Sequence, residues 1–130
     1  MSISDFAAAG TDFDAWLAAE FATGPFTALV VLVDIAGTTV TPVSSTFLNV
    51  VGDETEWAEV AALLAESGAE WNAAAFYPRR SEDGPLDNAA ARRALAAVTE
   101  RLVDDRLVLN EGCFVDGDGR RLMIEEVTAH

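Results

Sequence analysis

The sequence predicts an α+β fold, a two-layer sandwich in which about three helices pack on one face of a mixed or antiparallel sheet. Stretches with helical periodicity and β-rich stretches follow one another in the order α-β-β-α-β-α-β-β. Short turns at Gly37 and at residues 116–119 each separate two β-rich stretches, which predicts hairpins. A chain of 130 residues fits one domain. We expect residues 1–10 to form a tail and residues 11–130 to form the domain.

The first helix is expected to begin after Thr11, where Asp14 completes a relative of the capping box. Gly24-Pro25 should end it. Its apolar stripe recurs at helical spacing and is expected to dock on the sheet: Phe13, Trp16, Leu17 and Phe21.

Residues 26–35 are almost continuously apolar and β-branched, which predicts a central strand buried on both faces. Residues 39–51 should pair with this strand as a hairpin. Pro42 indicates a sheet edge or a bulge near the start of the second strand, because proline cannot donate to a ladder.

A second helix is expected to be capped by Asp53, with Glu56 at the reciprocal position, and to stop at Gly68. Residues 71–77 are predicted to be a strand, because aromatic residues precede Pro78 and the stretch lies between two helices. Glutamates along the second helix are interpreted as a solvated surface.

Asp87 should cap a third helix that runs to about Val103. A short strand is expected at residues 107–109. Residues 113–115 and 121–127 should form a last hairpin around the Asp-Gly turn.

The formal net charge is −14, and all eight basic residues are arginines. A surface this negative repels phosphate backbones and anionic lipids, so we expect no nucleic-acid or membrane partner. The charge favours a basic partner protein. The N-terminus lacks the basic residues of a targeting segment, and the longest apolar run is too short to span a bilayer, so a cytoplasmic location is expected.

The inventory of reactive side chains argues against an enzyme. Cys113 is the only cysteine, and the only histidine is His130 at the end of the chain. A Cys-His or Ser-His dyad and a histidine-rich zinc site are therefore not expected. We predict no catalytic residue, no metal and no cofactor.

Two short motifs nevertheless suggest chemistry. Residues 31–39 resemble the nucleophile loop of haloacid-dehalogenase-type phosphatases, in which Asp34 would be the nucleophile. Ala36 stands where that family has its second acid, and the chain has no lysine for the phosphate. In residues 114–125, Asp116, Asp118, Gly119 and Glu125 match four positions of an EF-hand loop. Phe114 stands at the first position, where an acid is needed, so a hairpin turn is the better interpretation.

The candidate ligand-binding residues are Trp71, Tyr77, Arg79 and Arg80. Arg79-Arg80 is one of three adjacent arginine pairs, with 92–93 and 120–121, and such pairs can bind a carboxylate or phosphate if two pairs converge. In so acidic a chain, pairing with neighbouring Asp and Glu is the alternative.

Three functional hypotheses remain open. The first is a non-enzymatic protein-interaction domain, of inhibitor, immunity or adaptor type, that offers an acidic face to a basic partner. The second is a small-molecule binding domain whose aromatic-lined pocket would use some of Trp16, Trp57, Trp71, Phe76 and Tyr77. The third is a phosphatase-like enzyme built on Asp34. Self-association through a strand edge is compatible with all three.

Overall fold

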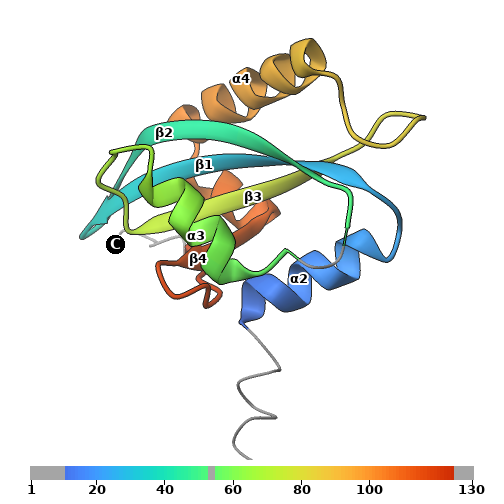
Figure 1. Ribbon diagram of the computed structural model, residues 1–130. Coiled ribbons are helices and arrows are strands. Elements are labelled where there is room, and N and C mark those ends of the chain that lie inside the picture. The colour runs from blue at the N-terminus through green and yellow to red at the C-terminus, as the bar shows by residue number, and fades with distance from the viewer. Residues whose placement is uncertain (1–10, 53–54, 125–130) are drawn as a thin grey trace, which may run out of the picture.

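Four antiparallel strands form one sheet in the computed structural model, which describes residues 11–52 and 55–124. The strand order is β2-β1-β3-β4 (Figure 1). The strands are β1 (Phe26–Ala36), β2 (Thr39–Val50), β3 (Ala73–Arg79) and β4 (Cys113–Asp116). The predicted α+β class with an antiparallel sheet is confirmed. The expected tail at residues 1–10 lies outside the described residues.

The β1–β2 hairpin has the predicted position and the predicted defect. β1 pairs with β2 from Phe26 opposite Val50 to Ala36 opposite Thr39. The register shifts where Leu32 faces Ser44 and Val33 faces Pro42, so one extra residue bulges beside the proline. β2 is also an edge strand. The backbone N–H that proline lacks is therefore not missing from the interior of the sheet.

The helices cover both faces of the sheet instead of the one face expected. Helices α2 (Asp12–Phe21) and α3 (Trp57–Ala65) pack on one face. Helix α4 (Asn88–Asp104) and the 3₁₀ helix η1 (Arg106–Glu111) pack on the other. The reason lies in β1, whose residues from Phe26 to Val33 are all buried, so each face needs a cover (Figure 1).

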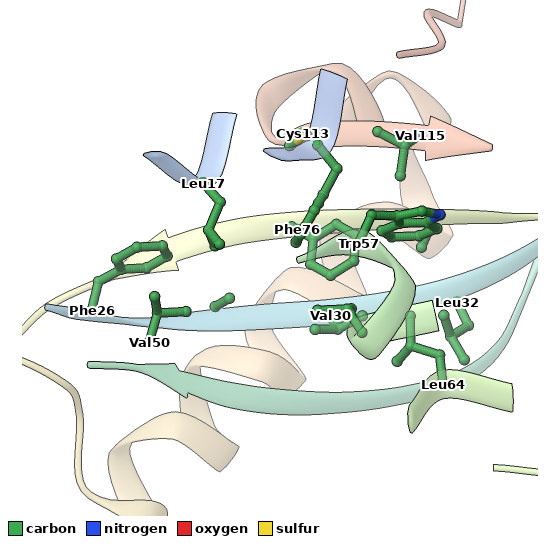
Figure 2. Packing of buried hydrophobic residues seen from close by; sticks show 14 residues of the cluster. Leu17, Phe26, Val30, Leu32, Val50, Trp57, Leu64, Phe76, Cys113 and Val115 are labelled. Atoms are coloured by element: carbon green, nitrogen blue, oxygen red, sulfur yellow. The ribbon is translucent and has the colours of Figure 1, made fainter. Parts of the chain in front are cut away.

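The core on the α2–α3 side is rich in aromatic rings. Figure 2 shows Phe76 from β3 and Trp57 from α3 meeting above Val30 of β1. Phe13 lies between them, with its ring centroid 4.7 Å from that of Phe76 and 5.1 Å from that of Trp57. Rings at such distances in tilted geometry attract one another beyond their buried area. The opposite core is mainly aliphatic and is completed by Tyr77 and Phe114.

Helix α3 begins later than the sequence suggests. Its first residue is Trp57 and its N-cap is Glu56, whose side chain makes no capping hydrogen bond. The predicted cap, Asp53, lies outside the described residues. Asp14 of α2 supplies an acceptor instead, because its Oδ1 accepts the Trp57 backbone N–H at 2.8 Å. The first turn of α3 is therefore held from another helix.

The segment after α4 forms a 3₁₀ helix, so the strand predicted at residues 107–109 is wrong. Asp105 caps this helix by accepting the Leu107 N–H at 3.0 Å, and Val108 and Leu109 enter the core. Three consecutive apolar residues are compatible with a strand or with a 3₁₀ helix. The aspartate before them favours the 3₁₀ helix, because its side chain accepts a backbone N–H.

The last hairpin is present only at its base. Val115 and Arg121 form a single bridge, and Leu122 N–H donates to the Phe114 carbonyl at 2.8 Å. Residues 122–124 are not in a strand, so the predicted strand is wrong there, and its residues 125–127 lie outside the described residues. Among the described helices, none is long and apolar enough to cross a membrane.

Candidate functional site

The four predicted ligand residues do not form one site. Trp71 precedes β3 and packs against the aromatic core, whereas Arg79 ends the same strand and Arg80 follows it. Tyr77 is buried on the α4 side, where its hydroxyl donates to the Val108 carbonyl at 3.0 Å. These side chains therefore lie at two ends and on two faces of one strand.

Arg80 has a structural partner that the sequence does not suggest. Its Nη2 donates to the carbonyls of Glu20 at 2.7 Å and Gly24 at 3.1 Å, and its Nη1 pairs with Glu20 Oε2 at 3.1 Å. Its guanidinium carbon lies 5.0 Å from the Phe26 ring centroid. Arg80 thus supplies the positive charge that the C-terminal end of α2 lacks. Arg79 donates to the neighbouring Pro78 carbonyl.

The other arginine pairs do not join it. Arg120 pairs with Asp116 and Asp118 in the turn after β4, at the N-terminal end of α2, where Asp12 accepts the Arg121 backbone N–H. Arg80 is at the opposite end of that helix. The pair at residues 92–93 is exposed on α4, across the sheet. The three arginine pairs therefore do not converge on one site for a carboxylate or phosphate.

The two chemical motifs are also accounted for by local structure. Asp34 is exposed in an antiparallel strand, and within the described residues no arginine lies at ion-pair distance from it. In the turn after β4, Asp116 Oδ1 accepts the N–H groups of Asp118 and Arg120. Across residues 11–52 and 55–124, no group of three acidic, histidine or cysteine side chains is arranged to hold a metal ion.

Cys113 lies on β4 inside the aromatic core. Burial raises the pKa of its thiol to about 11, although the nearby Arg121 acts in the opposite direction. A thiol that stays protonated at neutral pH is a poor nucleophile, so Cys113 behaves as a small apolar side chain.

The structure contains a cavity that sequence patterns did not indicate. It lies between α2, α3 and the sheet, and it has a volume of about 330 Å³. Its walls are mainly apolar, with Asn49, Thr55 and Glu59 as polar members. Glu59 is exposed and Leu63 is 48% exposed, so α3 provides the rim. The residues that line it include Phe13, Leu17, Ala28, Leu48, Val50, Val60 and Phe76.

This cavity overlaps only partly with the predicted aromatic pocket. Phe76 is the one residue of the predicted set in its wall. Trp57 stands behind the wall, with its ring centroid 5.1 Å from that of Phe13, and Trp16 packs against Phe13 at 5.8 Å. The volume and the apolar lining fit the range of small-ligand sites.

Negative charge is concentrated around this side of the molecule. Residues 1–78 contain eleven acidic residues and no basic one, whereas residues 79–130 contain eleven acids and all eight arginines. Both α2 and α3 belong to the first part. Glu20 of α2 pairs with Arg80, and the other acids of α2 and α3 have no ion-pair partner among the described residues. A cation at the rim would therefore find a favourable potential.

No protein-family model, curated protein or solved structure matches this chain.

Proposed function

We propose that this protein binds a small apolar molecule that carries a cationic group. The observation that carries the proposal is the cavity of about 330 Å³ between α2, α3 and the sheet, with an apolar interior and Glu59 at its rim. The apolar body would replace water against Leu17, Val60 and Phe76. The cationic group would remain at the rim beside Glu59, where both charges keep part of their hydration.

Titration with a matched set of ligands tests this proposal. Octylammonium, octanol and octanoate share one apolar chain and differ in charge. Trp57 contacts Phe13 in the cavity wall, so tryptophan fluorescence should report occupancy, and calorimetry should give the affinity. We expect octylammonium to bind most tightly and octanoate most weakly. Equal affinities for octanoate and octylammonium would contradict the proposal that the rim beside Glu59 binds a cationic group.

Three substitutions locate the site. Ala28 is buried in the cavity floor, so Ala28→Leu should occupy part of the cavity and weaken binding of all three ligands. Glu59→Gln should weaken octylammonium alone by about two- to fivefold, the worth of one exposed ion pair. Glu66→Gln is the control, because Glu66 follows the same helix outside the cavity. Unchanged affinity in Ala28→Leu would exclude the cavity.

A basic partner protein is the second candidate function, and it is favoured by the absence of basic residues before Arg79. An acidic face formed by α2 and α3 would attract such a partner at long range and would do so less at high salt. An arginine-rich peptide, added to the same titration, separates the two candidates. Peptide binding that is lost at high salt but persists in Ala28→Leu supports the protein partner instead of the small ligand.

A further inference from the structure

The outer edge of β2 has no strand beside it among the described residues and carries little protection beyond its first residues. β2 is paired with β1 on one side, and no described strand lies on its other side (Figure 1). The chain has a net charge of −14, yet residues 38–52 contain no charged side chain. Exposed edges normally carry charges, prolines or bulges that prevent pairing with another strand. Here Pro42 and its bulge protect only the beginning of the strand, and the run from Ser44 to Val50 is regular.

Exposed apolar side chains border this regular run at both ends. Val43 is 38% exposed and Val51 is 69% exposed, and each lies four residues from Phe47. An antiparallel pair of identical strands has a two-fold axis, and an axis at Phe47 would bring Val43 of one chain opposite Val51 of the other. Val43 is the extra residue of the bulge and Val51 follows the last residue of β2, so in this register the two valines flank the ladder from Ser44 to Val50.

We propose that β2 is a homodimer interface, in which two copies of the chain pair antiparallel about Phe47. The charge distribution favours a second copy of the chain as the partner of this edge. Two chains of −14 repel each other, and a strand without charge is where they can meet with the least added repulsion. A basic partner would instead be attracted to the acidic helices α2 and α3. In the dimer, Ser45 faces Asn49 of the second copy.

The dimer joins two four-stranded sheets into one continuous sheet of eight strands. A two-fold axis perpendicular to the sheet keeps α4 of both copies on one face and α2 and α3 on the other. On the α4 face, a hollow of about 360 Å³ beside Ser45 is lined by Arg92 and Leu95, so side chains of α4 would lie next to the interface. On the opposite face, Leu48 and Val50 of β2 also line the cavity, so each ligand site would lie next to the interface.

The salt dependence of the oligomeric state distinguishes this dimer from a complex with a basic partner. Sedimentation equilibrium of the full chain should give a dimer whose dissociation constant decreases as salt is added, because salt screens the repulsion between two like-charged copies. A chain that remains monomeric at every salt and protein concentration would overturn the proposal. A dimer that dissociates as salt is added would also overturn it.

A matched pair of charge substitutions tests the position of the interface. Thr46 and Thr39 are both exposed on β2, but only Thr46 lies in the proposed ladder. Thr46→Glu places two carboxylates close to the axis and should raise the dissociation constant at least about tenfold. Thr39→Glu makes the same chemical change before the bulge and should leave it unchanged. Equal effects of the two substitutions on the dissociation constant would exclude this edge of β2 as the dimer interface.

Disulfide trapping tests the register. Val43→Cys and Val51→Cys should cross-link when the two variants are mixed and oxidised, and neither should cross-link alone, because the equivalent positions lie far apart along the ladder. Cys113 is buried and should not interfere. Cross-linking of Val43→Cys with itself would contradict the axis at Phe47. Circular dichroism on each variant verifies that the fold is retained.

Discussion

At the scale of single residues, Asp14 performs two tasks with one carboxylate. Its Oδ2 accepts the Thr11 N–H at 2.9 Å and closes the capping box of α2. Its Oδ1 accepts the Trp57 N–H at 2.8 Å and holds the first turn of α3. Half of this arrangement was predictable, because Thr11 and Asp14 have capping-box spacing. The other half joins residues 43 positions apart, and no local pattern indicates it.

Substitution of Asp14 should therefore cost more than substitution of an ordinary cap. Asp14→Ala leaves two backbone donors without their acceptor and should lower the free energy of unfolding by about 2–3 kcal/mol. Asp87 caps only α4, through the Ala90 N–H at 2.7 Å. Asp87→Ala should cost about 1 kcal/mol. Urea denaturation measures both, and equal costs would show that the bond to Trp57 contributes nothing.

At the scale of elements, the turn after β4 fastens both helices of one face to the sheet. Phe13 N–H donates to the Gly119 carbonyl at 3.1 Å, and the Trp57 indole N–H donates to the Gly117 carbonyl at 3.2 Å. The sequence predicted this turn from its Asp-Gly repeats. Its role as an anchor could not be predicted, because both partners come from the N-terminal half of the chain.

Alanine substitutions at two glycines separate the cost of crowding Trp57 from the cost of a positive φ. Gly37 and Gly119 both have positive φ, at 64° and 77°. A Cβ at Gly37 would meet nothing within 4 Å, so Gly37→Ala should cost only the backbone strain, about 1–2 kcal/mol. A Cβ at Gly119 would lie 2.9 Å from the Trp57 ring, so Gly119→Ala should cost a further ~1–3 kcal/mol. Thermal denaturation compares the two, and a smaller cost at Gly119 would refute the close packing.

At the scale of the whole molecule, the sheet has a core on each face, and each core buries one ionisable group. Cys113 lies in the α2–α3 core and Tyr77 in the α4 core. Burial raises the pKa of Cys113 to about 11 and holds the pKa of Tyr77 well above its ordinary value. The chain contains no lysine, so these two are the side chains whose ordinary pKa values, 9.0 for the thiol and 10.0 for the phenol, lie in the moderately alkaline range.

The free energy of unfolding should therefore decrease at alkaline pH. Two variants separate the contribution of Cys113 from that of Tyr77. In the unfolded chain the thiol ionises near its ordinary pKa of 9.0, whereas the folded state keeps it protonated until about pH 11. The unfolded state loses its proton first, so stability is complete below pH 9 and falls as pH rises toward 11. Cys113→Ala should flatten this part of the pH profile, and Tyr77→Phe should flatten the part that begins at higher pH. Urea denaturation across this range measures the slopes, and an unchanged slope in Cys113→Ala would contradict the burial of the thiol.

The sequence by itself determined most of the helices and strands and their local details. The central position of β1, the bulge at Pro42 and the caps at Thr11 and Asp87 follow from residues within a few positions of one another, where propensity and capping act. The burial of β1 on both faces also implied helices on both faces. The one-sided arrangement expected at first conflicts with that feature of the sequence.

Only the tertiary structure decided which distant groups meet. Arg80 reaches Glu20 across 60 positions, and Asp12 accepts the Arg121 N–H across 109. The cavity is a space left between α2, α3 and the sheet, so its existence depends on how these elements pack and not on any one of them. Local patterns encode backbone conformation, whereas partners and cavities arise from the geometry of packing, and for that reason the candidate sites could not be read from the sequence.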